Sequence, residues 1–324
     1  MVPADLDLAN GELGPRTGPS ASGHDQRAAR RALPAANRER PSTSRVYDYF
    51  LGGENNLPVD RALAAKLSAT LPDIGAIMRE NRAFLRRAVR FLADIGVRQF
   101  LDLGSGIPTA GNVHEVAQRR GRRARVVYVD LDPTAVARSR RLLAGNPSAT
   151  IVQADLRDPR AVLGHPEVRR LIDLAEPVAV LILGVLHDIP DADDPAAIIA
   201  GFRDSLAPGS FLALSQAMAG TRPEAGKATN AYNDGYAGGA PRLSLRDRAQ
   251  TLEFFSGFDL VAPGLVFLED WRPDRAQSAR ATSSRTKPTR ARPVSAHVGR
   301  APEQPVPEGL VPGHRAALCG IGIR

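Results

Sequence analysis

One short stretch constrains the fold more than any other, because an apolar run passes directly into a glycine loop. The apolar residues Phe100, Leu101 and Leu103 directly precede the loop Gly104-Ser105-Gly106. This order is typical of a buried parallel strand that ends in a loop where backbone lies against a ligand. Glycine suits such a loop because a Cβ would collide with the ligand or forbid the backbone conformation. The stretch predicts an α/β fold, although a glycine loop alone also fits an ordinary turn.

Carboxylates at the ends of the next two predicted strands favour the ligand interpretation. The strand 125–130 ends in Asp130 and is followed by a helical pattern, and the strand 149–153 is followed by Asp155. In a doubly wound sheet, an acid at the tip of the second strand, roughly 20 residues beyond the glycine loop, can accept hydrogen bonds from a ribose diol. The three strand ends together predict a cofactor that carries a nucleoside.

These segments resemble a known family. Residues 101–106, 129–133 and 153–156 are similar to the consecutive motifs of S-adenosylmethionine (SAM)-dependent methyltransferases with the Rossmann-like fold. The segment Arg45-Val-Tyr-Asp-Tyr-Phe-Leu-Gly-Gly53 closely resembles the entry motif of an actinobacterial group of S-adenosyl methyltransferases whose acceptor is unknown. The resemblance covers about residues 44–274 and the last strand. It implies a seven-stranded Rossmann-like α/β sheet with SAM over the carboxyl ends of the first four strands.

The resemblance also implies which residues bind the cofactor. The glycine loop would approach the methionine part, Asp130 the ribose, and Asp155 with Leu156 the adenine. The full predicted set comprises Asp102, Gly104, Ser105, Gly106, Asp130, Leu131, Asp155, Leu156 and Gly184. Arg45 and Arg82 are candidates for a bidentate pair with the methionine carboxylate, the alternative for each being a solvent-facing side chain.

The fourth predicted strand, 177–183, leads to the candidate catalytic residue. His187 follows this strand at the edge where open α/β sheets bind ligands, and its ordinary pKa lies near neutrality. The segment 186–191 is similar to one in small-molecule O-methyltransferases whose histidine acts as a base, so His187 is the predicted base. The structural alternative is a pocket-lining or helix-capping role, with Asp188 or Asp191 as the N-cap of a helix over 195–206.

The other segments predict helices, one loop and two short strand segments, 258–261 and 265–268. Apolar spacing predicts two helices between Asp60 and Asp94, separated near Pro72. Residues 220–241 are polar and glycine-rich and are predicted to form a loop over the site, where Tyr232 and Tyr236 could contact the acceptor. Residues 244–255 predict a further helix.

The sequence divides into five predicted segments. Residues 1–44 form a disordered tail, 45–97 a helical cap, 98–275 the SAM-binding core, 276–316 a disordered insertion and 317–324 the final strand. The insertion carries seven Lys or Arg residues and two Glu, so much of the net charge of +8 belongs to it. It could contact nucleic-acid phosphates, but it lacks aromatic residues for base stacking, and a solvated insertion is the simpler interpretation.

Composition excludes several classes of function. Cys319 is the single cysteine and the six histidines lack metal-ligand spacing, which predicts neither an intramolecular disulfide nor a bound metal. No apolar run approaches the ~20 residues of a membrane span, and the amino-terminal stretch lacks the apolar core of a signal peptide, so a cytoplasmic protein is expected.

Two other classes stay open beside a methyltransferase with a small-molecule acceptor. One is an NAD-linked oxidoreductase, which is disfavoured because Thr109 replaces the third glycine of the dinucleotide fingerprint. The other is a noncatalytic protein that binds SAM or nucleic acid.

Overall fold

The structure is a computed structural model that describes residues 39–108, 111–121, 123–218, 223–236, 242–274 and 317–324. The predicted disordered tail, apart from residues 39–44, and the whole predicted insertion 276–316 lie outside the described residues.

Within the described residues, eight strands form one mixed sheet in the order β3-β2-β1-β4-β5-β8-β6, with β7 also paired to β8. Strands β1 to β5 are mutually parallel, whereas β8 runs antiparallel to β5, β6 and β7. The strands are β1 Gln99–Leu103, β2 Arg125–Asp130, β3 Ala149–Gln153, β4 Ala179–Leu183, β5 Phe211–Ala217, β6 Asp259–Leu260, β7 Val266–Phe267 and β8 Ala317–Ile323.

This sheet confirms the predicted Rossmann-like α/β architecture and differs from it in one detail. Eight strands are present among the described residues where seven were predicted, and the short strands β6 and β7, which fall within the predicted strand segments 258–261 and 265–268, pair with opposite ends of β8. Pro263 and Gly264 lie between them, and proline has no backbone N–H with which to continue a ladder. The predicted final strand, 317–324, is present as β8.

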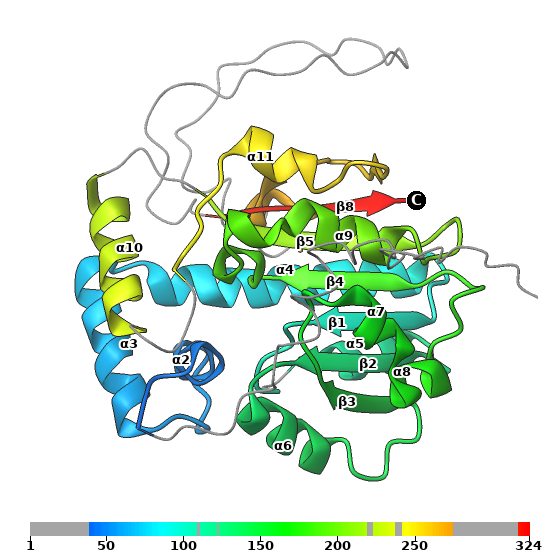
Figure 1. Ribbon diagram of the computed structural model, residues 1–324, viewed down its shortest axis with the longest axis horizontal. Helices are drawn as coiled ribbons and strands as arrows, with labels where there is room; N and C mark the ends of the chain where they lie inside the picture. The colour runs from blue at the N-terminus through cyan, green and yellow to red at the C-terminus, as the bar shows by residue number, and fades with distance from the viewer. Residues whose placement is uncertain (1–38, 109–110, 122, 219–222, 237–241, 275–316) are drawn as a thin grey trace, which may run out of the picture. The chain divides into compact units, whose positions relative to one another are not determined.

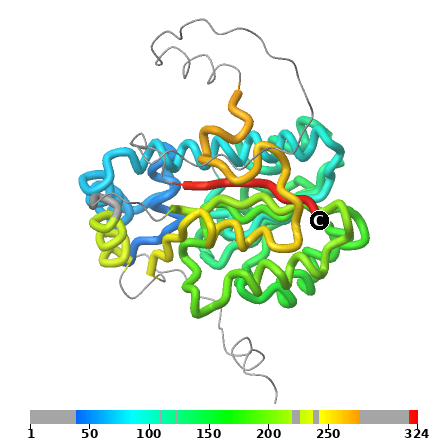
Figure 2. The backbone as a smooth tube through the Cα atoms, turned by 90° about the horizontal axis from the view of Figure 1, so that it is seen from above, coloured from blue at the N-terminus to red at the C-terminus, as the bar shows by residue number. Residues whose placement is uncertain are grey.

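Helices cover both faces of the sheet, and each face has its own apolar core. Residues of one strand alternate between the cores, so Phe100 packs on the first face and Leu101 on the second. Figure 2 shows α4 on one side of β8 and the helices that follow β3 and β4 on the other. The first face carries α4 Ile74–Asp94, α5 Val113–Arg120 and α6 Pro133–Leu142; the second carries α7 Pro159–Gly164, α8 Pro166–Leu171, α9 Pro195–Arg203 and the end of α11 Arg248–Glu253.

A third apolar core belongs to α2 Thr43–Phe50, α3 Pro58–Thr70 and α10 Pro223–Gly235. Figure 1 shows these helices gathered at the carboxyl end of the parallel strands. The two predicted helices between Asp60 and Asp94 are confirmed as α3, which begins two residues earlier at Pro58, and as α4. The loop predicted over 220–241 is wrong for residues 223–235, which form α10. Glycine content misled the prediction: a Cβ on Gly235 would lie 2.1 Å from a methyl of Leu63, so this glycine lets α10 approach α3 closely.

Short 3-10 turns follow β4 and β7. They are η1 Leu186–Asp188, η2 Asp191–Asp193 and η3 Leu268–Asp270. The N-cap of α9 is Asp194, whose side chain accepts a hydrogen bond from the N–H of Ala197. The alternative caps Asp188 and Asp191 are therefore wrong, which leaves their carboxylates to other partners.

Candidate functional site

The two glycines of the loop after β1 serve different purposes. Both have positive φ, +71° at Gly104 and +66° at Gly106. A Cβ on Gly104 would lie 2.6 Å from the side chain of Val185, so this glycine permits close packing against the turn after β4. A Cβ on Gly106 would meet no atom within 4 Å. The loop therefore leaves open space beside Gly106, which a ligand could occupy.

Asp130 fixes the glycine loop from the end of β2. Its Oδ2 accepts a hydrogen bond from the N–H of Gly106 at 2.6 Å, and its Oδ1 accepts one from the N–H of Asp132 at 2.8 Å. Burial raises the pKa of Asp130 to about 6, while these backbone N–H groups act in the opposite direction. The carboxylate predicted to bind a ribose is thus held in place by backbone N–H groups at the end of β2.

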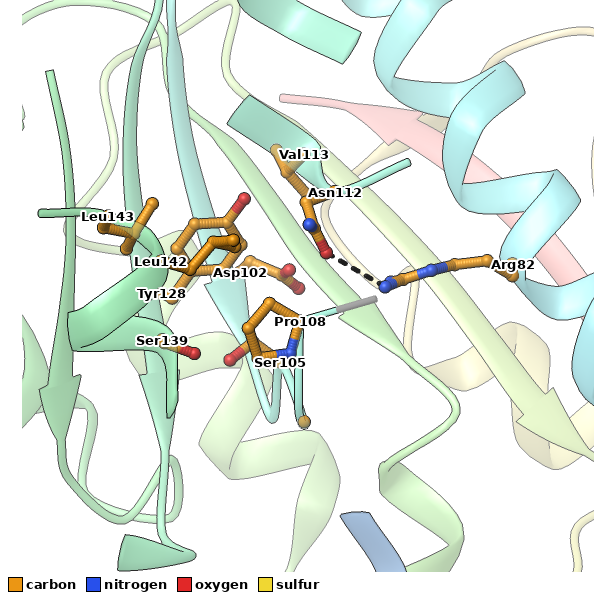
Figure 3. A pocket seen from close by; sticks show the side chains of 11 residues that line it. Arg82, Asp102, Ser105, Pro108, Asn112, Val113, Tyr128, Ser139, Leu142 and Leu143 are labelled. Atoms are coloured by element: carbon orange, nitrogen blue, oxygen red, sulfur yellow. Dashed lines mark hydrogen bonds between the residues drawn. The ribbon is translucent and has the colours of Figure 1, made fainter. Parts of the chain in front are cut away.

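Asp102 is a buried carboxylate on β1 that lines a pocket beneath the loop (Figure 3). None of the described residues donates a hydrogen bond to it, and its charged neighbours are Arg82 and Asp130. Burial raises its pKa to about 7; Arg82 lowers that pKa and Asp130 raises it further. A carboxylate buried without donors is costly, so this position suits a cationic ligand group.

Two more polar groups line the same pocket. Arg82 reaches it from α4 and donates from Nη2 to Oδ1 of Asn112 at 3.1 Å, as Figure 3 shows. Ser105 Oγ is buried with no hydrogen-bond partner among the described residues. A carboxylate, a guanidinium and an unpartnered hydroxyl together match a ligand that carries both an ammonium and a carboxylate group.

The structure separates Arg45 from this pocket. Its Nε donates to Oδ2 of Asp60 at 2.6 Å, and both side chains are almost fully buried. Asp60 also accepts from the N–H of Ser42 and of Leu57. Arg45 and Asp60 therefore join α2 to α3. Arg45 and Arg82 were both predicted to bind the ligand carboxylate, but Arg82 lines the pocket and Arg45 does not.

The remaining predicted cofactor residues lie at the same sheet edge but have protein partners. Asp155 forms an ion pair with Arg157 at 2.6 Å, and Arg157 also pairs with Asp193 at 3.0 Å. Leu156 is buried in the core of the second face. The carbonyl of Leu131 accepts from Gln153 Nε2 at 3.3 Å. Gly184 has a φ of +68°, and a Cβ there would lie 2.9 Å from Nδ2 of Asn81.

The predicted base His187 lies in η1, directly after β4. Its side chain is half-buried, and its Nδ1 is buried with no hydrogen-bond partner among the described residues. Burial lowers the pKa of His187; Asp188 raises that pKa and Arg246 lowers it. The imidazole is consequently neutral near pH 7, with a ring nitrogen able to accept a proton.

Sequence reasoning missed Arg246, which holds η1 in place. Its side chain is buried and donates to the carbonyls of Leu186 and Ile189, each at 2.8 Å, and to Asp191 at 2.7 Å. The N–H of Ser244 donates to the carbonyl of His187 at 2.7 Å. Residues 244–246 therefore brace the turn on both sides of His187. The predicted helix over 244–255 is wrong for residues 244–247, because α11 begins at Arg248 with Asp247 as its N-cap. Local patterns did not reveal the contacts of Arg246, because they join residues 55 or more positions apart.

A second missed contact brings α10 to the same turn. The hydroxyl of Tyr232 donates to Oδ1 of Asp188. The rings of Tyr232 and Tyr236 pack with their centroids 4.6 Å apart. The prediction had placed both tyrosines near the acceptor on a loop, whereas Tyr232 lies on α10 and Tyr236 directly follows the end of that helix.

The strand order, the antiparallel β8 and the pocket beneath a glycine loop define an α/β enzyme of the class that binds a nucleoside cofactor at the carboxyl edge of its sheet. Residues 29–301 match the family described as S-adenosyl methyltransferase. This chain belongs to that family, so it is a SAM-dependent methyltransferase with SAM as its cofactor. The family match identifies the cofactor as SAM and not as NAD, which the glycine loop alone also allowed.

Solved structures agree with this assignment. A candidate methyltransferase from Thermobifida fusca is 37% identical, with a TM-score of 0.74, over 89% of this chain and 96% of that chain. A DUF574 family protein from Streptomyces avermitilis is 34% identical, with a TM-score of 0.74, over 88% of this chain and 98% of that chain. Among proteins with curated functions, none matches this chain.

None of the described helices combines the length and the apolar character needed to cross a bilayer. Within the described part of the chain, His, Cys, Asp and Glu side chains form no group of three that could hold a metal ion.

Proposed function

We propose that this enzyme transfers the methyl group of SAM to an oxygen or nitrogen atom of a small-molecule acceptor. One observation carries the proposal: His187 has a buried, unpartnered Nδ1 in a turn that residues 244–246 brace and α10 contacts. The turn that carries this side chain is enclosed by these segments, which favours a small molecule over a folded macromolecule as its ligand.

The cofactor site uses the pocket beneath the glycine loop. Asp102 and Arg82 would bind the ammonium and carboxylate of the methionine part, and Ser105 Oγ would gain the partner that it lacks within the protein. Asp130 would accept hydrogen bonds from the ribose hydroxyls with its remaining lone pairs. The cofactor roles of the other predicted residues stay predictions: Asp155, Leu156, Leu131 and Gly184. Asp155 already forms an ion pair with Arg157.

Bound SAM supplies a methyl group on a sulfonium that is already activated for attack. The work left to the protein is therefore orientation, with proton removal as a second contribution. His187 would accept the proton that the acceptor loses, because its burial keeps the imidazole neutral at working pH.

Calorimetry and a turnover assay test these roles separately. SAM is titrated into the wild type, Asp102→Asn and His187→Ala. The control is Asp204→Asn, which changes an exposed acid at the end of α9. S-adenosylhomocysteine (SAH) formation is then measured with a panel of phenols, alcohols and amines. We expect Asp102→Asn to weaken SAM binding by about 10- to 100-fold, as for loss of a charge-assisted contact, and His187→Ala to bind SAM normally but lose turnover.

Two results would count against the proposal. Unchanged SAM affinity in Asp102→Asn would remove this carboxylate from the cofactor site. Turnover that survives in His187→Ala would show that orientation alone suffices and that His187 is not a base.

A further inference from the structure

The charge of the groups around His187 indicates the chemistry of the acceptor, an inference that rests on the proposed function. Asp188 is the adjacent acid, and its hydrogen-bond partner among the described residues is the neutral hydroxyl of Tyr232. No described Lys or Arg forms an ion pair with it. His187 next to it is neutral, since burial lowers its pKa. Burial raises the pKa of Asp188, so the ionised form of this acid lacks both solvent and a protein counter-charge and would be stabilised by a cationic ligand.

The nearby cations are already committed to other acids. Arg246 pairs with Asp191 at 2.7 Å and with two backbone carbonyls. Arg45 pairs with Asp60 at 2.6 Å. An anionic acceptor would thus meet the Asp188 carboxylate without a cation to offset the repulsion, whereas a cationic acceptor would supply the missing counter-charge.

Aromatic rings accompany this carboxylate. Tyr232 contacts Asp188 through its hydroxyl, and its ring packs against Tyr236 at 4.6 Å with an angle of 55° between the ring planes. A tyrosine whose hydroxyl contacts a carboxylate places its aromatic ring within reach of an ammonium group bound to that carboxylate, which adds cation–π attraction to the charge. An alcohol would gain neither contribution at comparable strength.

We propose that the acceptor carries an amine, that Asp188 and Tyr232 bind its ammonium form, and that His187 receives the proton lost before methyl transfer. The ammonium gives one proton to the imidazole of His187, which frees the nitrogen lone pair. That lone pair forms the N–C bond as the C–S bond of SAM breaks, leaving neutral SAH and a methylated ammonium. His187 then releases its proton to solvent, so one proton is produced per methyl group.

Three matched probes test this inference on the full chain with SAH bound. They are benzylammonium, benzyl alcohol and benzoate, which share a ring and differ in the charge of one group. The readout is the NMR shift of the Tyr232 and His187 ring signals during titration. Assignment is practical because the chain has five tyrosines and six histidines, and Tyr232→Phe and His187→Ala identify the two signals.

We expect benzylammonium to bind at least about 10-fold more tightly than benzyl alcohol, and benzoate to bind most weakly. Asp188→Asn keeps an oxygen for the Tyr232 hydroxyl but removes the charge, so it should bring benzylammonium and benzyl alcohol to near parity. The control Asp204→Asn should keep the wild-type preference.

The inference is overturned if benzyl alcohol or benzoate binds as tightly as benzylammonium, if Asp188→Asn leaves the preference unchanged, or if none of the probes shifts either signal. Calorimetry of SAH on the same sample separates this outcome from failure of the cofactor assignment. Probes that fail to discriminate while SAH binds reject the amine alone, whereas absent SAH binding rejects the proposed function and this inference with it.

Discussion

Individual residues at the ends of β1 and β2 are held in ionisation states that a ligand can change. Asp102 and Asp130 lie on neighbouring strands, both buried, with pKa values raised to about 7 and about 6 from an ordinary 3.8. Backbone N–H groups stabilise the ionised form of Asp130, whereas Asp102 has no such donor among the described residues. Binding of a cationic group beside Asp102 should therefore release a proton near neutral pH.

The burial of Asp102 predicts how stability depends on pH without ligand. Because its folded pKa of about 7 exceeds its unfolded value of 3.8, the folded state binds this proton more tightly. The free energy of unfolding should fall as pH rises from about 4 through 7, by about 2–4 kcal/mol from this group. Urea unfolding of the wild type and Asp102→Asn between pH 4.5 and 8 measures the difference. A constant difference across that range would contradict a raised pKa.

The two loop glycines provide a matched pair of substitutions. Gly106→Ala should cost about 1–2 kcal/mol of stability, because φ is +66° but the added methyl meets open space. Gly104→Ala should cost more, roughly 2–5 kcal/mol, because the methyl would also overlap Val185. Thermal unfolding ranks the two variants. SAM affinity should fall in Gly106→Ala despite its milder effect on stability, and an intact affinity would show that the space beside Gly106 is not used by the cofactor.

At the scale of elements, two segments distant in sequence shape the turn after β4. Residues 244–246 brace η1 through backbone and side-chain hydrogen bonds, and α10 contacts it through Tyr232. The guanidinium of Arg246 also lies 5.2 Å from the ring centre of Phe254, so α11 supports the same brace. The geometry of His187 therefore depends on three elements and not on β4 alone.

Arg246 gives this arrangement a direct test. Arg246→Met should lower the free energy of unfolding by about 2–4 kcal/mol, since two carbonyls lose their donor. It should also raise the pKa of His187 towards 6.5, because a nearby cation is removed and the turn becomes more hydrated. Arg246→Lys keeps the charge and should shift that pKa less. NMR titration of the His187 ring measures both effects, and equal pKa values in all three proteins would mean that η1 does not need the brace.

The sequence was informative about elements where local patterns dominate. Buried strands with glycine or acid at their ends predicted β1 to β4, Asp130 and the pocket residues Asp102, Ser105 and Gly106. Helix α10 was missed because its glycine content reflects close packing against α3, which local patterns do not reveal. The pairs Arg45–Asp60 and Tyr232–Asp188 were missed because partner choice is settled by tertiary contacts between separate elements.

The described part of the molecule contains separate apolar cores in different places. Two cores lie on the faces of the sheet, while the third joins α2, α3 and α10 over the carboxyl edge of the strands. A small core buries less apolar surface and opens at lower cost than a large one. The helices over the site should therefore open more readily than the sheet that carries the glycine loop.

Truncation of one leucine in each region tests this difference. Leu67→Ala lies in the third core and Leu92→Ala in the core of the first face, and both side chains are buried. Each should cost about 2–5 kcal/mol. Hydrogen exchange should accelerate in α2, α3 and α10 for Leu67→Ala but across the sheet for Leu92→Ala. The same exchange pattern in both variants would mean that the cores unfold together.

The position of β8 determines when the sheet can be completed during synthesis of the chain. β8 lies between β5 and the two short strands β6 and β7, yet it is the last of these to be translated. About 50 residues separate β7 from β8, so at about 5–20 residues per second a ribosome needs roughly 3–10 seconds to supply it. Throughout that interval β5 lacks one neighbour, and its exposed backbone is a target for chaperones or for another nascent chain.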